Sequence, residues 1–279
     1  MSETQKTIDE SLAYNARLIE RVDITDELAI GKVAMDQGPA PNFIAGQFAE
    51  LGLPLRDDEL TDAQRERALK RGKPALVRRA YSIASSPSTR DHLEFYLTLV
   101  KHGKLTTRLW SLEAGQQLYM SESARGHFTL EPVPSDVDIV MVATGTGLAP
   151  FLSMLRMYHN QNRWRRVALI HATRVAADLG YRDELESLAK DDASIFYLPT
   201  VTREPEDGGW TGHRGRPQAL LEDGQLEKLT GITLNPDQCH IMLCGNPLMI
   251  DQIETLSREH GYTQHKKKQP GSLHFERYW

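Results

Sequence analysis

Cysteine is scarce in this chain of 279 residues, which contains only Cys239 and Cys244. Two thiols are too few for a disulfide framework, and too few for an iron–sulfur or zinc site held by four thiolates. We therefore expect no metal site, and any redox chemistry would need an organic cofactor.

Long apolar runs and excess positive charge are also missing. No stretch approaches the ~20 apolar residues that cross a bilayer, and residues 1–6 lack the apolar core of a signal peptide. We expect a cytoplasmic protein that does not bind a membrane. The net charge of −5 argues against a general nucleic-acid binder.

What is present is an ordinary globular composition, with 40% hydrophobic and 25% charged residues, and a length that suggests two domains. Residues 1–15 form an N-terminal tail to which we assign no function. Alternating hydrophobicity or turn residues then predict strands and hairpins at 16–33, 47–51, 93–100 and 118–120. We expect an antiparallel β-barrel of about six strands over 16–135, interrupted at about 56–73 by a charged, solvated insertion that allows a short helix.

The pattern changes at 132–136, where two prolines interrupt the chain. Beyond this point strands at 139–143, 167–171, 195–198 and 240–244 alternate with helical segments. Such alternation predicts an α/β domain over 136–279 with a parallel sheet covered on both faces. Ligands of these sheets bind at the carboxyl ends of the strands.

A short motif in the barrel half, Arg79-Ala80-Tyr81-Ser82, combines a cation, an aromatic ring and a hydroxyl. Side chains alternate along a strand, so Arg79 and Tyr81 would share one face. Arginine binds phosphate oxygens and tyrosine offers a ring for stacking, which suits the pyrophosphate and planar ring of FAD. The alternative is ordinary packing within a strand.

A second segment, 103–109, begins with a glycine and then carries hydroxyl groups. Gly103, Thr106 and Thr107 could direct donors at a phosphate near a helix start. The alternative is a plain capped helix.

Two glycine turns follow predicted strands of the α/β half. Gly145-Thr146-Gly147-Leu148-Ala149-Pro150 is a dinucleotide-type loop that departs from G-x-G-x-x-G because proline replaces the third glycine. Cys244 lies in the other turn, where it would either border a nicotinamide or be a buried structural cysteine.

Together these segments resemble the bacterial ferredoxin/flavodoxin–NADP⁺ reductases, in the family's order and spacing over about residues 16–279. The resemblance rests on Arg-Ala-Tyr-Ser, Gly-Thr-Gly-Leu-Ala-Pro, Cys-Gly-Asn-Pro and a terminal Tyr-Trp. It implies FAD contacts at Arg79, Ala80, Tyr81, Ser82, Leu97, Thr98, Leu99, Lys104, Leu105, Thr106, Thr146, Tyr278 and Trp279. It implies NADP(H) contacts at Gly145, Gly147, Thr173, Arg174, Thr202, Arg203 and Arg216.

The resemblance also implies roles for three residues at the reacting rings. Ser82 would hydrogen-bond near the flavin N5 atom, and Cys244 would border the nicotinamide. Trp279 would cover the flavin face opposite Tyr81 and move aside for nicotinamide, although a chain-terminal aromatic can also be loose or simply packed.

The expected function is that of a monomeric reductase in which NADPH gives hydride to FAD, and electrons then pass singly to ferredoxin or flavodoxin. Arg174 and Arg203 follow neighbouring predicted strands, and in the resembling family such positions bind the 2′-phosphate of NADPH. Charge-assisted bonds of ~1.5–3 kcal/mol each would favour NADPH over NADH by orders of magnitude. The alternatives are an NAD(P)H-dependent ferric or free-flavin reductase and a non-catalytic FAD-binding redox sensor.

Overall fold

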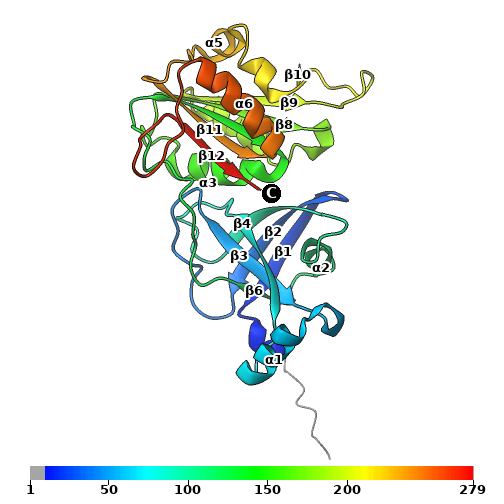
Figure 1. Cartoon of the computed structure of the whole chain (residues 1–279). Helices are drawn as coiled ribbons and strands as arrows, with labels where there is room; N and C mark the ends of the chain where they lie inside the picture. Colours follow the sequence, from blue (N-terminus) through cyan, green and yellow to red (C-terminus); the bar gives the residue numbers. More distant parts are fainter. Residues whose placement is uncertain (1–9, 279) are drawn as a thin grey trace, which may run out of the picture. The chain divides into compact units, whose positions relative to one another are not determined.

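The computed structural model describes residues 10–278, and this part of the chain divides into two compact units (Figure 1). The first unit runs through Phe43 and includes Phe48–Ile83 and Pro87–Arg125. The second contains Ile44–Gln47, Ala84–Ser86 and the chain from Gly126 onward. An antiparallel sheet therefore precedes a parallel one, and the predicted fold class is confirmed.

The first unit is built on an antiparallel sheet with the order β4-β3-β6-β1-β2-β5 among its described residues. The bridge from Ile83 to Phe95 joins the end of β4 to β5 and closes the sheet toward a barrel. The strands are β1 (Ala16–Thr25), β2 (Leu28–Met35), β3 (Phe48–Pro54), β4 (Leu76–Ser82), β5 (Leu93–Thr98) and β6 (Gln117–Met120).

The charged insertion contains a surface helix, α1 (Asp62–Arg71), after the 3-10 turn η2 (Asp57–Glu59). Thr61 caps the helix by accepting a hydrogen bond from the Gln64 N–H, and Gly72 ends it in a left-handed conformation at φ 62°. Only Ala68 of α1 is buried, so the helix is held mainly by its caps. Two other short elements of this unit are η1 (Glu10–Ala13) and α2 (Thr106–Trp110).

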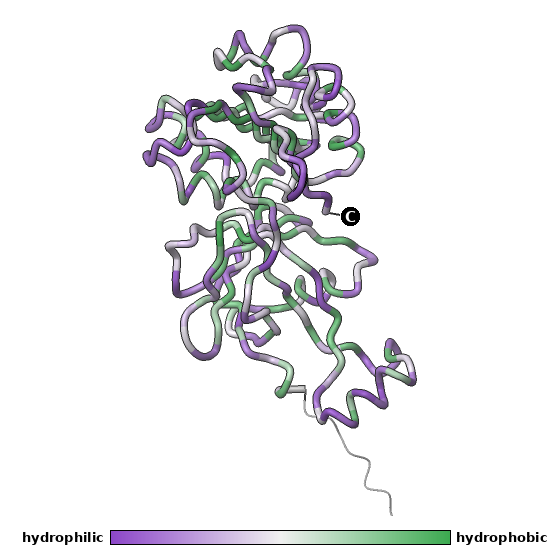
Figure 2. Tube along the Cα trace, turned by 60° about the vertical axis from the view of Figure 1, so that its left-hand side comes forward, coloured by the Kyte–Doolittle hydropathy of each residue, from purple (hydrophilic) through white to green (hydrophobic). Residues whose placement is uncertain are grey.

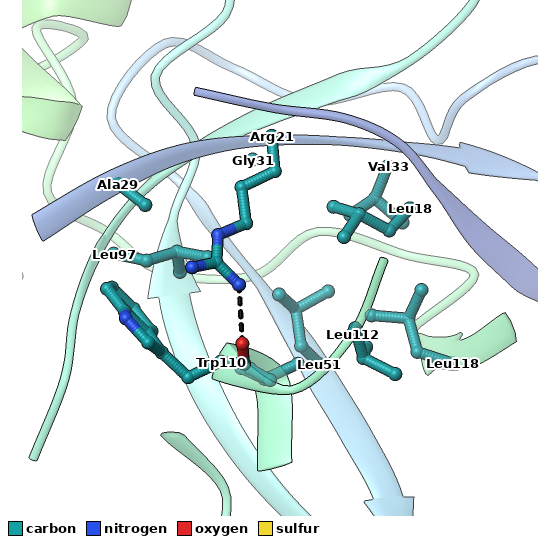
Figure 3. A pocket seen from close by; sticks show the side chains of 11 residues that line it. Leu18, Arg21, Ala29, Gly31, Val33, Leu51, Leu97, Trp110, Leu112 and Leu118 are labelled. Carbon is teal, nitrogen blue, oxygen red and sulfur yellow. Dashed lines mark hydrogen bonds between the residues drawn. The ribbon is translucent and has the colours of Figure 1, made fainter. Parts of the chain in front are cut away.

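Leucine and valine side chains fill the interior of the first sheet (Figure 3). Arg21 reaches across one end, where its guanidinium lies over the Trp110 ring at 4.9 Å and donates to the Trp110 carbonyl at 2.6 Å. The cavity beneath this pair has a volume of about 10 Å³. That volume holds at most one water, so the interior of the barrel is packed and cannot take a cofactor.

The second unit is a parallel sheet with the order β10-β9-β8-β7-β11-β12 in the described chain. Its strands are β7 (Asp138–Thr144), β8 (Arg166–Thr173), β9 (Ile195–Val201), β10 (His213–Arg214), β11 (Cys239–Gly245) and β12 (Leu273–Arg277). The central strands are buried along nearly their whole length, which is typical of a sheet covered on both faces. Figure 2 shows hydrophobic residues gathered at the centre of this unit and hydrophilic ones on its loops.

Helices alternate with these strands. They are α3 (Ala149–Tyr158), α4 (Arg182–Asp191), α5 (Gln225–Thr230) and α6 (Pro247–Glu259), with 3-10 turns η3 (Gly145–Leu148), η4 (Ala176–Asp178) and η5 (Pro217–Leu220). Proline lies in the first turn of both α3 and α6, where its missing N–H is not needed. Across the described residues, none of the helices has the length and apolar character needed to span a membrane.

Candidate functional site

The Arg79–Ser82 motif forms the carboxyl end of β4. Tyr81 is half-buried and meets the Phe95 ring of β5 edge-on, with ring centroids 6.5 Å apart. Burial raises the pKa of Tyr81 to about 12, against the opposing effect of the nearby Arg79 charge. The Arg79 guanidinium is exposed and donates to the Arg78 carbonyl at 2.7 Å, whereas Ser82 is buried.

The β5 residues of the predicted site lie opposite this motif. The bridge between Ile83 and Phe95 continues the antiparallel pairing, so Tyr81 falls near Leu97. Thr98 and Leu99 both bond to the Glu27 carbonyl, through the Thr98 hydroxyl at 3.2 Å and the Leu99 N–H at 2.8 Å. The structure therefore brings the motif and residues 97–99 to one edge of the first unit.

The hydroxyl groups of the turn at 103–107 bond within the turn itself. The Thr106 hydroxyl donates to the Val100 carbonyl at 3.1 Å, and the Thr107 hydroxyl donates to the Gly103 carbonyl at 2.8 Å. Both hydroxyl hydrogens are thus used inside the turn, as in a plain capped helix. The backbone N–H groups of 104–107 form no hydrogen bond within the described residues, and such N–H groups suit an anionic ligand.

In the second unit the two glycine turns interlock. A Cβ atom on Gly147 would lie 2.3 Å from the Cys244 carbonyl oxygen, and one on Gly245 would lie 2.2 Å from Thr144 Oγ1. The Asn246 N–H donates to Thr144 Oγ1 at 2.7 Å. Gly145 adopts a left-handed φ of 52° and has open space before it. The turn itself is the 3-10 turn η3, and α3 begins directly after it at Ala149.

Cys244 lies beside these turns and is fully buried. Burial raises the pKa of its thiol well above its ordinary value, which favours the neutral thiol; a neutral thiol is compatible with both roles considered for this residue. The Tyr278 N–H donates to the Gly245 carbonyl and its hydroxyl to the Thr146 carbonyl, both at 3.4 Å. Trp279 lies outside the described residues. Cys239, which we placed before the strand, is the first residue of β11 and is also buried.

The arginines predicted for NADP(H) lie at the carboxyl edge of the parallel sheet. The Arg203 N–H donates to the Arg174 carbonyl at 2.8 Å, and the Thr202 N–H donates to the Thr173 carbonyl at 3.0 Å. These bonds continue the pairing of β8 with β9 into the two loops. Arg216 follows β10, beside the same edge. All three guanidinium groups belong to exposed residues and form no ion pair with any described residue.

Comparison with known proteins assigns these features to a family. A model of the oxidoreductase NAD-binding domain matches residues 141–255. A flavodoxin/ferredoxin–NADP reductase of Escherichia coli is 38% identical over 243 residues, covering 86% of this chain and 90% of that protein. The chain belongs to the flavodoxin/ferredoxin–NADP reductase family.

Two further reductases support the assignment. A ferredoxin–NADP reductase of Pseudomonas aeruginosa is 30% identical, covering 86% of this chain and 88% of its own. The structure of a ferredoxin NADP⁺ reductase from Neisseria gonorrhoeae with bound FAD and NADP superposes with a TM-score of 0.80 at 26% identity, covering 96% and 99% of the two chains. Both halves of this reductase-family chain are therefore matched.

The structural role of one residue at the edge of the second sheet was not predicted from the sequence. Asn246 accepts a hydrogen bond from the Leu248 N–H at 2.8 Å and caps α6, while its own N–H holds Thr144. Asparagine followed by proline at a helix start is a usable signal for this role. Nothing in the sequence distinguishes Thr144, because its partner is 102 residues away.

Proposed function

We propose that this protein is an NADPH-dependent flavoprotein reductase, in which hydride passes from NADPH to FAD and single electrons then pass to ferredoxin or flavodoxin. The names of its relatives and the ligands of the Neisseria structure support this activity. The observation that carries the proposal is the backbone bond that pairs Arg174 with Arg203. A protein that only held a flavin would have no use for a second nucleotide site.

In this proposal residues 16–135 bind FAD and residues 136–279 bind NADP(H). The donors of the first unit fit the cofactor: an exposed Arg79 guanidinium and the unbonded N–H groups of 104–107 favour a pyrophosphate, and the half-buried Tyr81 ring offers a stacking face. Bound FAD supplies the conversion of a two-electron donor into one-electron transfers. The chain itself orients the rings, with Ser82, Cys244 and Trp279 proposed to lie against them.

The nature of the flavin gives a direct test of the first site. The purified protein is expected to be yellow and to release FAD on denaturation, because the Arg79 guanidinium and the N–H groups of 104–107 suit a pyrophosphate. FMN lacks that group. Chromatography of the released flavin distinguishes the two, and FMN alone would contradict the assignment.

The choice of nicotinamide cofactor tests the second site. Each of Arg174→Ala and Arg203→Ala should lower kcat/KM for NADPH by about 10- to 100-fold, since each removes a charge-assisted bond to the 2′-phosphate. Rates with NADH should change little. Arg258→Ala is the matched control, because Arg258 is an exposed cation of the same unit that pairs with Glu254 on α6. Equal losses with both nucleotides would mean that the arginines act through stability instead.

We also propose a cytoplasmic monomer whose electron acceptor is a carrier protein. Light scattering after gel filtration should give a mass near the 31.5 kDa of the chain. A ferric or free-flavin reductase would share both nucleotide sites, so only the relative rates with the different acceptors separate that activity from the proposed one.

A further inference from the structure

The loops that carry Arg174 and Arg203 are joined by a side chain as well as by their backbones. Beyond the bond from the Arg203 N–H to the Arg174 carbonyl, the Glu204 carboxylate accepts a hydrogen bond from the Ala176 N–H at 2.6 Å. Ala176 begins η4, two residues after Arg174. A charge-assisted bond of this kind is about twice as strong as a neutral one.

Glu204 is itself fixed from the other side. Arg214 of β10 donates through Nη1 to the Glu204 carbonyl at 2.8 Å, and through Nη2 to the carbonyls of Pro205 at 3.2 Å and Trp210 at 3.3 Å. A Cβ atom on Gly208 would lie 2.6 Å from Glu204 Oε1, so a larger residue there would require the carboxylate to shift. Arg214 therefore holds the backbone of the loop after β9 on one side, and the Glu204 carboxylate ties the loop to Ala176 on the other.

The carboxylate does not neutralise the neighbouring arginines. Glu204 forms no ion pair with Arg174, Arg203 or Arg216, all of which lie in the described chain. A negative charge beside a phosphate site should weaken phosphate binding by repulsion. The hydrogen bond from the Ala176 N–H is a structural role of the carboxylate that can offset this repulsion.

We propose that Glu204 is a positioning residue that ties the Arg174 loop to the Arg203 loop and so holds the two guanidinium groups at one spacing for the 2′-phosphate. This inference rests on the proposed NADPH specificity of the site. The hydrogen bond should raise affinity for the phosphate, whereas the charge alone should lower it. A substitution that removes the hydrogen bond should therefore weaken phosphate binding, whereas one that removes only the charge should leave binding unchanged or strengthen it.

The test uses the FAD-loaded protein and 2′,5′-ADP as the probe, with binding measured by calorimetry. Glu204→Ala removes bond and charge together, and its Kd should rise about tenfold if the loss of one such bond loosens the loops. Glu204→Gln keeps an oxygen that can accept from Ala176 and removes the charge, so its Kd should equal or fall below that of the wild type. Binding of 5′-AMP, which lacks the 2′-phosphate, should be unchanged in both variants.

Glu206→Ala is the matched control, because Glu206 is an exposed carboxylate in the same loop. Its Kd should not rise. The same pattern should appear in the KM for NADPH, with kcat preserved, since the reacting rings are not involved.

Two results would overturn the inference. Glu204→Ala could bind 2′,5′-ADP as tightly as the wild type, or Glu204→Gln could bind as weakly as Glu204→Ala, which would assign the effect to charge. Failure of the proposed function looks different, because 2′,5′-ADP would then bind no better than 5′-AMP to the wild-type protein.

Discussion

The two glycines of the turn after β7 should respond differently to the same added methyl group. In Gly147→Ala, the new Cβ atom would lie 2.3 Å from the Cys244 carbonyl oxygen, 2.7 Å from its carbon and 2.9 Å from the Gly245 Cα atom. All three atoms are backbone and cannot rotate away. In Gly145→Ala, the Cβ atom would meet nothing within 4 Å, but the residue would have to keep a φ of 52°.

The magnitudes follow from these two causes. Overpacking a rigid site costs about 1–3 kcal/mol, and contact with backbone places Gly147→Ala near the upper end, at about 3 kcal/mol. A non-glycine residue in the left-handed region costs about 1–2 kcal/mol, and Asn tolerates that region better than Ala. For a unit of this size each kcal/mol lowers Tm by about 2–4 °C. Gly147→Ala should therefore lower the transition of the second unit by about 6–12 °C, and Gly145→Ala by about one-third to two-thirds as much.

Scanning calorimetry of the FAD-loaded variants measures both effects, with Gly145→Asn as a third variant that should lie closest to the wild type. NADP⁺ affinity should also fall more for Gly147→Ala, because the whole turn must shift away from β11. The reasoning would be refuted if Gly145→Ala were the more damaging change, or if Gly147→Ala melted with the wild type.

Three further predictions concern buried titratable groups of the second unit. His240 and His274 stack with ring centroids 5.2 Å apart, and burial lowers their pKa values to about 4 and about 3. In the unfolded chain the two imidazoles take up protons near pH 6.5. The free energy of unfolding, measured in urea, should therefore be constant above that pH and fall by up to about 1.4 kcal/mol per pH unit per histidine toward pH 4. Replacing both histidines by Gln should flatten this pH dependence, and an unchanged profile would contradict the prediction. Burial tends to raise the pKa of Asp138, but hydrogen bonds from two arginines outweigh this effect and lower the pKa. The ionised carboxylate therefore stabilises the folded protein above about pH 4, and this stabilisation is lost in acid. Asp138→Asn should cost about 3 kcal/mol at pH 7 by denaturant titration, and a variant as stable as the wild type would disprove the role of the carboxylate. Cys244 should resist a disulfide exchange reagent in the native protein at pH 8 and react on unfolding, so rapid native labelling would count against its burial.

Much of the architecture was predictable because it rests on local periodicity. Alternating residues around the turn 25–27 predicted the hairpin of β1 and β2, and the repeated strand and helix pattern after 136 predicted the parallel sheet. The order of the strands was not predictable in the same way. The pairing of β7 with β11, some 100 residues apart, depends on which buried faces fit together.

The residues of the site differ in the same way in how far the sequence predicts them. Arg174 and Arg203 could be placed from the sequence, because parallel strands end at one edge of a sheet. The role of Glu204 could not, since its partner Ala176 is 28 residues away in another loop. The short-range hydrogen bond from the Thr106 hydroxyl to the Val100 carbonyl could not be predicted either, because the same hydroxyl could equally have faced a ligand.

The most direct test of the account is an anaerobic stopped-flow experiment on the FAD-loaded protein. NADPH is mixed in first, then oxidised ferredoxin or flavodoxin, with a ferric chelate and free flavin as competing acceptors. We expect NADPH to bleach the flavin far faster than NADH, and the carrier protein to be reduced faster than either small acceptor. A flavin that NADPH does not bleach, or a carrier reduced no faster than the ferric chelate, would contradict the proposed function.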